Sequence, residues 1–293
     1  MTATPTWHIT ADLDQFLYLA GDFLRSRPAP HTLQLTVTDT LRSRGRHIYG
    51  DGDPEFGVLE RDGTVTATFF RTPPGRLMPT RLTPGEAEAL AAQLADRGTE
   101  LPGIMAEQDT ATAFAEAWRR RTGSAPETGV HQRLYRLGEL TIPNPAPPGR
   151  PRVATAKDRE QLMRWYGEFV AAIGEHGATI GSAAWADARI SYGGVTLWET
   201  PDGTPVSMAG ATAKVAGQIR VAPVYTPADL RGRGYAGAVT AEVSRAARTA
   251  GATEVLLFTD LANPTSNALY QRIGYRPVTD FTAYDFGHGT GPR

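Results

Sequence analysis

The stretch Arg231-Gly232-Arg233-Gly234-Tyr235-Ala236-Gly237 joins a predicted strand to a predicted helix. Glycines let backbone N–H groups approach a bound group closely, and the first turn of a helix carries a partial positive charge. With the guanidinium groups of Arg231 and Arg233, these features can hold a pyrophosphate. The alternative, a glycine-rich surface turn, is disfavoured by the flanking strand and helix.

The same stretch also fits the dinucleotide-binding fingerprint, as Gly232-x-Gly234-x-x-Gly237, with Asp260 at the end of a later strand. Two observations weigh against that fold. Its glycines normally follow their strand directly, whereas residues 227–231 intervene here. Only residues 238–293 remain after Gly237, too few for the further strand–helix units of a doubly wound sheet.

A second motif lies in Asn263-Pro264-Thr265-Ser266-Asn267-Ala268-Leu269-Tyr270-Gln271-Arg272-Ile273-Gly274-Tyr275. Asn263-Pro264 is typical of a helix start, and Gly274 is typical of a left-handed helix end. Within this short helix, a polar stripe at positions i, i+3, i+4 and i+7 ends in a phenol; it comprises Asn263, Ser266, Asn267 and Tyr270. Such a stripe can line a cofactor channel, although a core tyrosine at position 270 is the simpler alternative.

The two motifs together resemble those of the GNAT superfamily of acyl-CoA-dependent N-acyltransferases. Arg231-x-x-Gly234-x-Ala236 is similar to its Arg/Gln-x-x-Gly-x-Gly/Ala signature, and residues 263–275 are similar to its second signature. The resemblance extends from Pro151 to Phe286. The phrases Val224-Tyr225-Thr226-Pro227 and Thr259-Asp260-Leu261-Ala262-Asn263 further resemble a bacterial subgroup of predicted acetyltransferases whose first half is a degenerate GNAT-like domain.

The resemblance implies a role for each matching residue. Residues 231–237 (Arg231, Gly232, Arg233, Gly234, Tyr235, Ala236 and Gly237) would hold the acyl-CoA pyrophosphate, and Asn263, Ser266 and Asn267 would line the CoA arm. The backbone of Val224, Tyr225 and Thr226 would pair with the pantetheine and offer an N–H group to the thioester oxygen. Tyr270 would assist the departing thiolate. A phenol near pKa 10 facing a thiol near 8.5 makes full proton transfer mildly uphill, so hydrogen bonding is its expected contribution.

Periodicity places these motifs in a mixed α/β half. Leu162, Trp165, Tyr166, Phe169 and Ile173 form the apolar stripe of a helix. The other expected elements are an antiparallel meander of Val195–Glu199, Val206–Lys214 and Gln218–Thr226, a helix at Gly234–Ala250, a strand at Val255–Phe258, the short helix, and a final strand at Pro277–Phe286. The expected class is an α/β (α+β) sandwich with a central mixed sheet flanked by helices.

The first half repeats this order more faintly, after an extra helix at Leu13–Phe23. We therefore predict two GNAT-like domains in tandem: residues 1–138, a proline-rich linker at 139–152, and a catalytic domain at 153–293. The first domain has Gly75-Arg76-Leu77-Met78-Pro79 where the loop signature would stand, so we expect no acyl-CoA there.

An attacking amine must be neutral, and alkylammonium groups near pKa 10 are mostly protonated at pH 7, so a base or a water relay is required. The segment Gln218–Pro223 lacks the carboxylate that the superfamily often carries on this strand. Glu199, at a strand end, is the candidate base. Glu175 and His176, after the apolar helix, are further candidates, and solvated surface positions are the alternative for all three.

Composition excludes several classes. The chain has 293 residues, a net charge of −1, no cysteine and six histidines without close ligand spacing, so we expect no metal site, no nucleic acid and no membrane partner. No apolar run reaches the roughly 18 residues of a membrane span. We expect a cytoplasmic protein that is a monomer or a homodimer.

The combined prediction is an N-acetyltransferase that transfers the acetyl group of acetyl-CoA to a primary amine, in a small-molecule acceptor, by direct attack in a ternary complex. The alternatives are a transferase that uses another acyl-CoA, and a non-catalytic acyl-CoA-binding sensor or interaction protein. Amine-dependent release of CoA separates an enzyme from a sensor.

Overall fold

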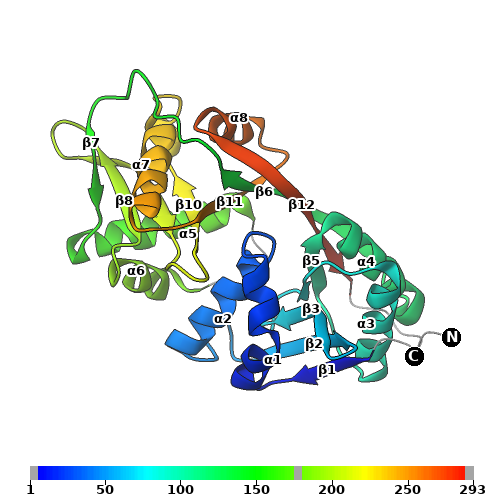
Figure 1. The fold of residues 1–293 in the computed structure, drawn as a ribbon. Helices are drawn as coiled ribbons and strands as arrows, with labels where there is room; N and C mark the ends of the chain where they lie inside the picture. The colour runs from blue at the N-terminus through cyan, green and yellow to red at the C-terminus, as the bar shows by residue number, and fades with distance from the viewer. Residues whose placement is uncertain (1–5, 175–179, 288–293) are drawn as a thin grey trace. The chain divides into compact units, whose positions relative to one another are not determined.

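The computed structural model describes residues 6–174 and 180–287 and shows two repeats with one element order (Figure 1). Each repeat runs strand, two helices, three strands, helix, strand, helix, strand. The first comprises β1 (Trp7–Thr10), α1 (Leu13–Ser26), α2 (Thr32–Arg44), β2 (Glu55–Arg61), β3 (Thr64–Arg71), β4 (Met78–Pro79), α3 (Pro84–Asp96), β5 (Gly103–Glu107), α4 (Gln108–Thr122) and β6 (Pro126–Leu137). The second comprises β7 (Arg150–Val153), α5 (Arg159–Ile173), α6 (Ser182–Ile190), β8 (Val195–Glu199), β9 (Pro205–Ala211), β10 (Gln218–Tyr225), α7 (Tyr235–Thr249), β11 (Glu254–Asp260), α8 (Pro264–Arg272) and β12 (Tyr275–Phe286). The predicted tandem α/β architecture is confirmed.

In the first repeat, helices cover both faces of an antiparallel sheet of order β1-β2-β3-β4. Phe69 of β3 packs in a core with Leu90 of α3 and Phe114 of α4. Its neighbour Phe70 points to the opposite face, since side chains alternate along a strand. There its cross-strand partner Phe56 stacks on Phe16 of α1, with ring centroids 4.9 Å apart.

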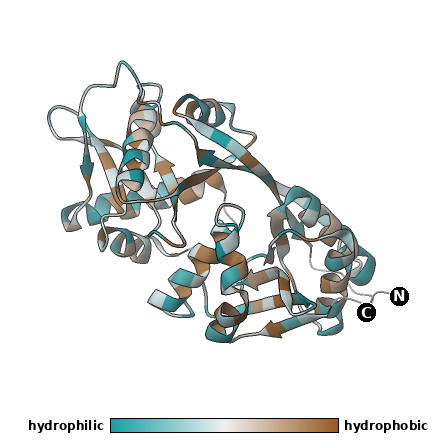
Figure 2. Cartoon of the chain, in the orientation of Figure 1, coloured by the Kyte–Doolittle hydropathy of each residue, from teal (hydrophilic) through white to brown (hydrophobic). Residues whose placement is uncertain are grey.

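In the second repeat, β7, β8, β9 and β10 form the antiparallel meander, and α7 crosses over to β11, which lies parallel to β10. One core, on the α7 and α8 side, includes Val239 and Tyr275, and a second core, against α5 and α6, includes Trp165 and Met208. Hydrophobic residues are concentrated on the strands between these helices (Figure 2). The antiparallel neighbour of β10 excludes a doubly wound dinucleotide sheet.

The pairing of β10 changes along its length. Gln218–Arg220 pair with Glu254–Leu256 of β11, and no further β10–β11 pair occurs in the described chain. On the other edge, the register with β9 shifts between Val221 and Val224, which marks a bulge or irregularity. Beyond residue 220, β10 therefore keeps its β9 partner while the edge that faces β11 is released.

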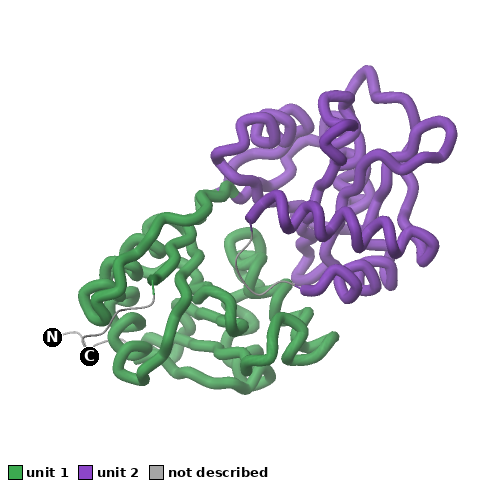
Figure 3. Tube along the Cα trace, turned by 180° about the vertical axis from the view of Figure 1, so that it is seen from behind, with its two compact units in different colours: residues 1–133, 177–179, 279–293 green, residues 134–176, 180–278 purple. Residues whose placement is uncertain are grey.

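The chain divides into two compact units whose limits differ from the predicted domains (Figure 3). Unit 1 comprises residues 1–133, 177–179 and 279–293, and unit 2 comprises residues 134–176 and 180–278. The difference arises because β6 and β12 are long strands that begin in one unit and end in the other. Thr279–Phe286 of β12 belongs to unit 1, where residues 281–285 pair with β5. The end of β6, from Leu134, belongs to unit 2.

Residues 139–149, the proline segment, belong to unit 2. The segment was predicted to form most of a linker, but it is attached along its length. Thr141 N–H donates to the Ile273 carbonyl at 3.0 Å, and Trp198 Nε1 donates to the Pro148 carbonyl at 3.1 Å. Arg150, at the end of the predicted linker, starts β7 and pairs with Glu199 of β8.

Five strands and α-helices were not predicted: β1, α2, β4, α6 and β7. Helix α2 shows the reason most clearly, because its sequence TLQLTVTDTLRSR has no regular apolar stripe. Its buried threonines donate their hydroxyls back into the helix, Thr36 to the Thr32 carbonyl and Thr38 to the Gln34 carbonyl, each at 2.7 Å. Tertiary burial therefore overrides the low helix propensity of threonine.

Candidate active site

The loop that leads into α7, residues 231–234, is exposed to solvent, whereas Tyr235 and Gly237 in the first turn are buried. Gly232 and Gly234 have φ angles of +76° and +85°, a region that favours glycine, and Gly234 is an N-cap without a side-chain cap. The first intrahelical bond runs from Ala238 N–H to the Gly234 carbonyl at 3.1 Å. The N–H groups of residues 235–237 therefore precede the hydrogen-bonded part of the helix and are available to an anion.

Both arginines of the loop fix its shape. Arg231 Nε donates to the Thr226 carbonyl at 3.0 Å, and Arg233 Nη2 donates to the Asp229 carbonyl at 3.0 Å. Each bond occupies one of the five N–H donors of a guanidinium, and both residues are exposed. The two arginines thus hold the loop against the end of β10 and keep further donors for a phosphate.

The corresponding helix of the first repeat, α3, has an N-terminus that its own side chains fill. Thr83 N–H donates to Glu86 Oε2 at 2.8 Å, and Glu86 N–H donates to Thr83 Oγ1 at 3.3 Å, which completes a capping box. Glu86 also pairs with Arg61 at 3.1 Å. A carboxylate at this place repels an anion, which gives a physical reason to expect acyl-CoA at α7 rather than at α3.

The end of β10 leads directly into this loop. Val224 and Tyr225 lie opposite Ala209 and Met208 of β9. Thr226 is buried; its Oγ1 lies 2.8 Å from Ser207 Oγ, and its carbonyl accepts the bond from Arg231. In the described chain, the released edge of β10 thus leaves the backbone of Val224 and Tyr225 without a partner in β11, while the carbonyl of Thr226 is already engaged.

Tyr270 lies in the core of unit 2 with 8% of its surface exposed, and its ring meets that of Tyr275 edge-on, with centroids 6.1 Å apart. Burial raises the pKa of Tyr270 to about 12, so the hydroxyl stays protonated near neutral pH. Tyr275 Oη is within 2.8 Å of Ser244 Oγ. By contrast, no residue of 6–174 or 180–287 forms a hydrogen bond with the Tyr270 hydroxyl, which leaves it available to a ligand.

The rest of the polar stripe of α8 has structural partners. Asn263 Oδ1 caps the helix by accepting from Ser266 N–H at 3.0 Å. Asn267 Nδ2 donates to the carbonyls of Asp260 and Asn263, each at 2.8 Å, and Asn267 Oδ1 accepts from Tyr135 at 2.9 Å. The side-chain oxygen and nitrogen of Asn267 are therefore both bound within the protein, and Tyr270 is the residue of this stripe best placed for chemistry.

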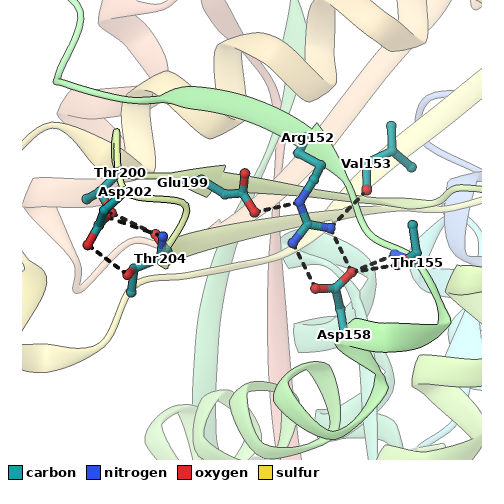
Figure 4. Close-up of polar contacts among 8 residues, drawn as sticks. All are labelled: Arg152, Val153, Thr155, Asp158, Glu199, Thr200, Asp202 and Thr204. Atoms are coloured by element: carbon teal, nitrogen blue, oxygen red, sulfur yellow. Dashed lines mark hydrogen bonds and ion pairs between the residues drawn. The ribbon is translucent and has the colours of Figure 1, made fainter.

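Glu199, the predicted base, belongs to a buried ion-pair network (Figure 4). Arg152 Nε donates to Glu199 Oε1 at 2.6 Å, while Arg152 Nη1 and Nη2 donate to the two oxygens of Asp158 at 2.7 and 2.8 Å. Arg152 and the Thr155 backbone lower the pKa of Asp158. Glu199 thus has a defined partner at the edge of the sheet. The alternative candidates Glu175 and His176 lie outside the described residues.

A carboxylate that the sequence did not single out lies beside β10. Tyr225 Oη donates to Glu168 Oε2 of α5 at 2.6 Å, and the rings of Tyr225 and Trp165 are 6.1 Å apart. Burial, followed by the interaction with Glu168, raises the pKa of Tyr225 to about 12. The helical spacing of Trp165 and Glu168, i and i+3, put both on one face of α5. Nothing in the sequence, however, indicated that this face meets Tyr225.

The proline segment forms one side of the α7 loop. A Cβ atom added to Gly234 would lie 3.8 Å from Pro147, and one added to Gly237 would lie 3.8 Å from Pro143 and 3.0 Å from Leu269 Cδ1 of α8. Residues that were expected to separate two domains therefore border the predicted pyrophosphate site.

Two other classes of site receive no support. Among the described residues, no group of three or more His, Asp or Glu side chains could hold a metal ion. No helix within residues 6–174 and 180–287 has the length and apolar character needed to cross a membrane. Asp260, the acid of the dinucleotide fingerprint, accepts from Ala262 N–H at 2.8 Å and so stabilises a turn.

Comparisons with known proteins bear on the fold. Residues 205–283 match the family described as FR47-like protein. A GCN5-related N-acetyltransferase from Sphaerobacter thermophilus is 16% identical with a TM-score of 0.59, over 95% of this chain and 94% of that chain. A GCN5-related N-acetyltransferase from Kribbella flavida is 18% identical with a TM-score of 0.58, over 89% and 96% of the two chains.

A tandem GNAT protein from the clavulanic acid biosynthesis pathway is 11% identical with a TM-score of 0.54, over 95% of this chain and 98% of that chain. No curated protein sequence matches the chain. The fold is that of the GNAT superfamily in its tandem form, as the two sequence motifs predicted.

Proposed function

We propose that the protein is an N-acetyltransferase that transfers the acetyl group of acetyl-CoA to a primary amine of a small-molecule acceptor, by direct attack in a ternary complex. One observation carries the proposal: the uncapped N-terminus of α7 follows a strand, β10, whose edge toward β11 is released beyond residue 220. These two features offer backbone N–H groups to phosphates and a backbone edge to an extended arm. The Tyr270 hydroxyl, which has no hydrogen-bond partner within residues 6–174 and 180–287, supplies a proton donor.

Different residues would bind the pyrophosphate, the CoA arm and the departing thiolate. The N–H groups of residues 235–237 and the remaining donors of Arg231 and Arg233 would bind the pyrophosphate. The exposed Asn263 would border the CoA arm, and the edge of β10 at Val224 and Tyr225 would pair with it. The thioester supplies the activated acetyl group. The Tyr270 hydroxyl, protonated because its pKa is about 12, would donate a hydrogen bond to the departing thiolate.

Calorimetric titration with acetyl-CoA tests the cofactor, with NAD as the competing ligand and Gly234→Trp as the blocked loop. We expect one acetyl-CoA per chain, no NAD binding, and loss of acetyl-CoA binding in Gly234→Trp. Amine-dependent release of CoA, measured with a thiol reagent, then separates an enzyme from an acyl-CoA sensor. Binding of a longer acyl-CoA but not of acetyl-CoA would favour a transferase with a different acyl group.

A further inference from the structure

The end of β10 separates two environments. Val224 packs against the core that contains Tyr270, on the side of α7 and α8. Tyr225, the next residue, packs against the core of α5 and α6. Neighbouring side chains point to opposite faces of a strand. Tyr270, which is proposed to assist the departing thiolate, and Tyr225 therefore lie on opposite faces of β10. The face of Tyr225 is therefore the one left for the acceptor.

On that face, the carboxylate of Glu168 accepts a hydrogen bond from an uncharged side chain. The Tyr225 hydroxyl donates to Glu168 Oε2 at 2.6 Å and, with a pKa of about 12, keeps its proton. The carboxylate is exposed to solvent, and Tyr225 is its hydrogen-bond partner in the part of the chain that the structure describes. The charge of Arg231 lowers the pKa of Tyr225, and the charge of Asp229 raises it. Within residues 6–174 and 180–287, no arginine forms an ion pair with Glu168.

Three other carboxylates of the second repeat are each paired with an arginine. Glu199 and Asp158 share Arg152, and Asp187 of α6 forms a two-point pair with Arg159, at 2.6 and 2.9 Å. These three acids already have a cation. Glu168 combines an accessible negative charge with a fixed direction, because Tyr225 holds one of its oxygens next to the strand that would carry the thioester.

We propose that Glu168, positioned by Tyr225, binds the ammonium group of the acceptor, and that the acceptor is a cationic primary amine. This inference rests on the proposed acetyltransferase function. After the ammonium loses a proton to water, the amine nitrogen bonds to the acetyl carbon, and the carbon–sulfur bond breaks. The nitrogen loses a second proton, and sulfur gains one to give CoA-SH. The sum is R–NH3+ plus acetyl-S-CoA giving the amide, CoA-SH and one H+.

The test compares three aromatic amines that differ in charge: phenethylamine, which is a cation at pH 7.5, phenylalanine, which adds a carboxylate, and aniline, which is neutral. We expect the protein to acetylate phenethylamine with the highest kcat/KM. Glu168→Gln should raise the KM for phenethylamine about tenfold, the factor that 1.4 kcal/mol represents. The preference for phenethylamine over phenylalanine should shrink in the same variant.

Controls separate binding of the amine from general damage. Glu160→Gln, an exposed glutamate on the same helix, should leave every parameter within about twofold. Tyr225→Phe should raise the amine KM in the same direction as Glu168→Gln, but less. The Kd for acetyl-CoA, measured by calorimetry, should be unchanged in Glu168→Gln and Glu160→Gln.

Three outcomes count against the inference. An unchanged amine KM in Glu168→Gln, or equal changes in Glu160→Gln, would remove Glu168 from the acceptor site. A preference for phenylalanine or aniline in the unaltered protein would exclude a site for cations. If acetyl-CoA binds but no amine of any charge is acetylated, the proposed function itself fails, and this inference loses its basis.

Discussion

At the scale of single residues, Tyr270 is the clearest case of a side chain whose environment indicates chemistry. A buried hydroxyl usually has a hydrogen-bond partner, as Tyr275 has in Ser244. The hydroxyl of Tyr270 has none in residues 6–174 and 180–287, so its removal leaves no buried group unsatisfied. Tyr270→Phe should therefore fold normally, with an unfolding free energy within about 1 kcal/mol of the unaltered protein.

In activity, Tyr270→Phe should lower kcat by about 10²-fold, the usual scale for a positioned proton donor, and leave the acetyl-CoA Kd within twofold. The hydroxyl is protonated up to about pH 12, so the ratio of the two rates should be constant from pH 7 to 10. The kcat/KM of both forms should rise over that range, because the amine acceptor becomes neutral. Equal losses of binding and turnover would contradict the assigned role.

Glu199 allows a direct decision between a catalytic and a structural carboxylate. Because Arg152 holds it, Glu199→Gln should lower the melting temperature while the pH profile of kcat/KM keeps its shape. If Glu199 were the catalytic base, Glu199→Gln would instead keep its melting temperature, and its rate would no longer depend on pH. Thermal unfolding and a rate profile from pH 6 to 10 distinguish the two outcomes.

Asp158, on the other side of Arg152, tests the same network through pH. Asp158→Asn should cost about 2 kcal/mol of unfolding free energy at pH 7, the scale of a charge-assisted hydrogen bond. The pKa of Asp158 lies below its ordinary 3.8 in the folded protein, so the carboxylate stabilises the fold above that pH. The difference between variant and unaltered protein should shrink as the pH falls below 3.8. Urea unfolding at pH 7 and pH 3 measures it, and a difference that does not depend on pH would exclude the ion pair as its cause.

At the scale of elements, corresponding helices of the two repeats differ at their N-termini. Side chains of α3 cap its own N-terminus, whereas the N-terminus of α7 has no side-chain cap and can bind a ligand. Counting seven residues from each N-cap gives Tyr270 in α8 and Phe114 in α4, so the first repeat also lacks the phenol. Gly234→Ala places a side chain in a backbone conformation with φ of +85°, which costs about 1 kcal/mol or more. It should weaken acetyl-CoA binding about tenfold by disturbing the loop.

The matched control for that change is Gly85→Ala in α3, which has open space around its Cβ position and should leave acetyl-CoA binding unchanged. Calorimetry of both variants provides the comparison. A loss of binding in Gly85→Ala would place a nucleotide at the first repeat instead, contrary to the carboxylate of Glu86 at that helix start.

Sequence patterns predicted the elements that a local rule governs. The meander, the α7 crossover and the Asn263 cap all follow from periodicity or from caps within a few residues. Helix α2 escaped prediction because burial, which the sequence does not display, stabilises its threonines. The contact between Glu168 and Tyr225 escaped for a related reason, since it joins α5 to β10 across residues far apart in the chain.

At the scale of the whole molecule, the same limit explains the domain boundaries. Prolines at 143–148 are a strong local signal for a linker, and they do interrupt regular structure. The prolines do not reveal that Thr141 bonds to Ile273 and Pro148 to Trp198, all within unit 2. Nor do they reveal that β12 ends in unit 1. Strand pairing is nonlocal, so a chain cut at residue 138 on sequence grounds would leave strands without the partners that complete their units.

Because β12 begins in unit 2 and ends in unit 1, the structure predicts how the protein responds to truncation. Ending the chain at Val278 removes the strand that pairs with β5 and takes Phe286 out of a core that also contains Phe114 and Trp118. Loss of a buried phenylalanine alone costs about 3–5 kcal/mol, so unit 1 should unfold at a lower temperature or fail to fold. A chain that ends at Gly287 keeps the whole of β12 and is the matched control. If independent domains met at residues 139–152, the chain ending at Val278 would instead keep a fully stable first domain, and calorimetric unfolding of both chains tells these cases apart.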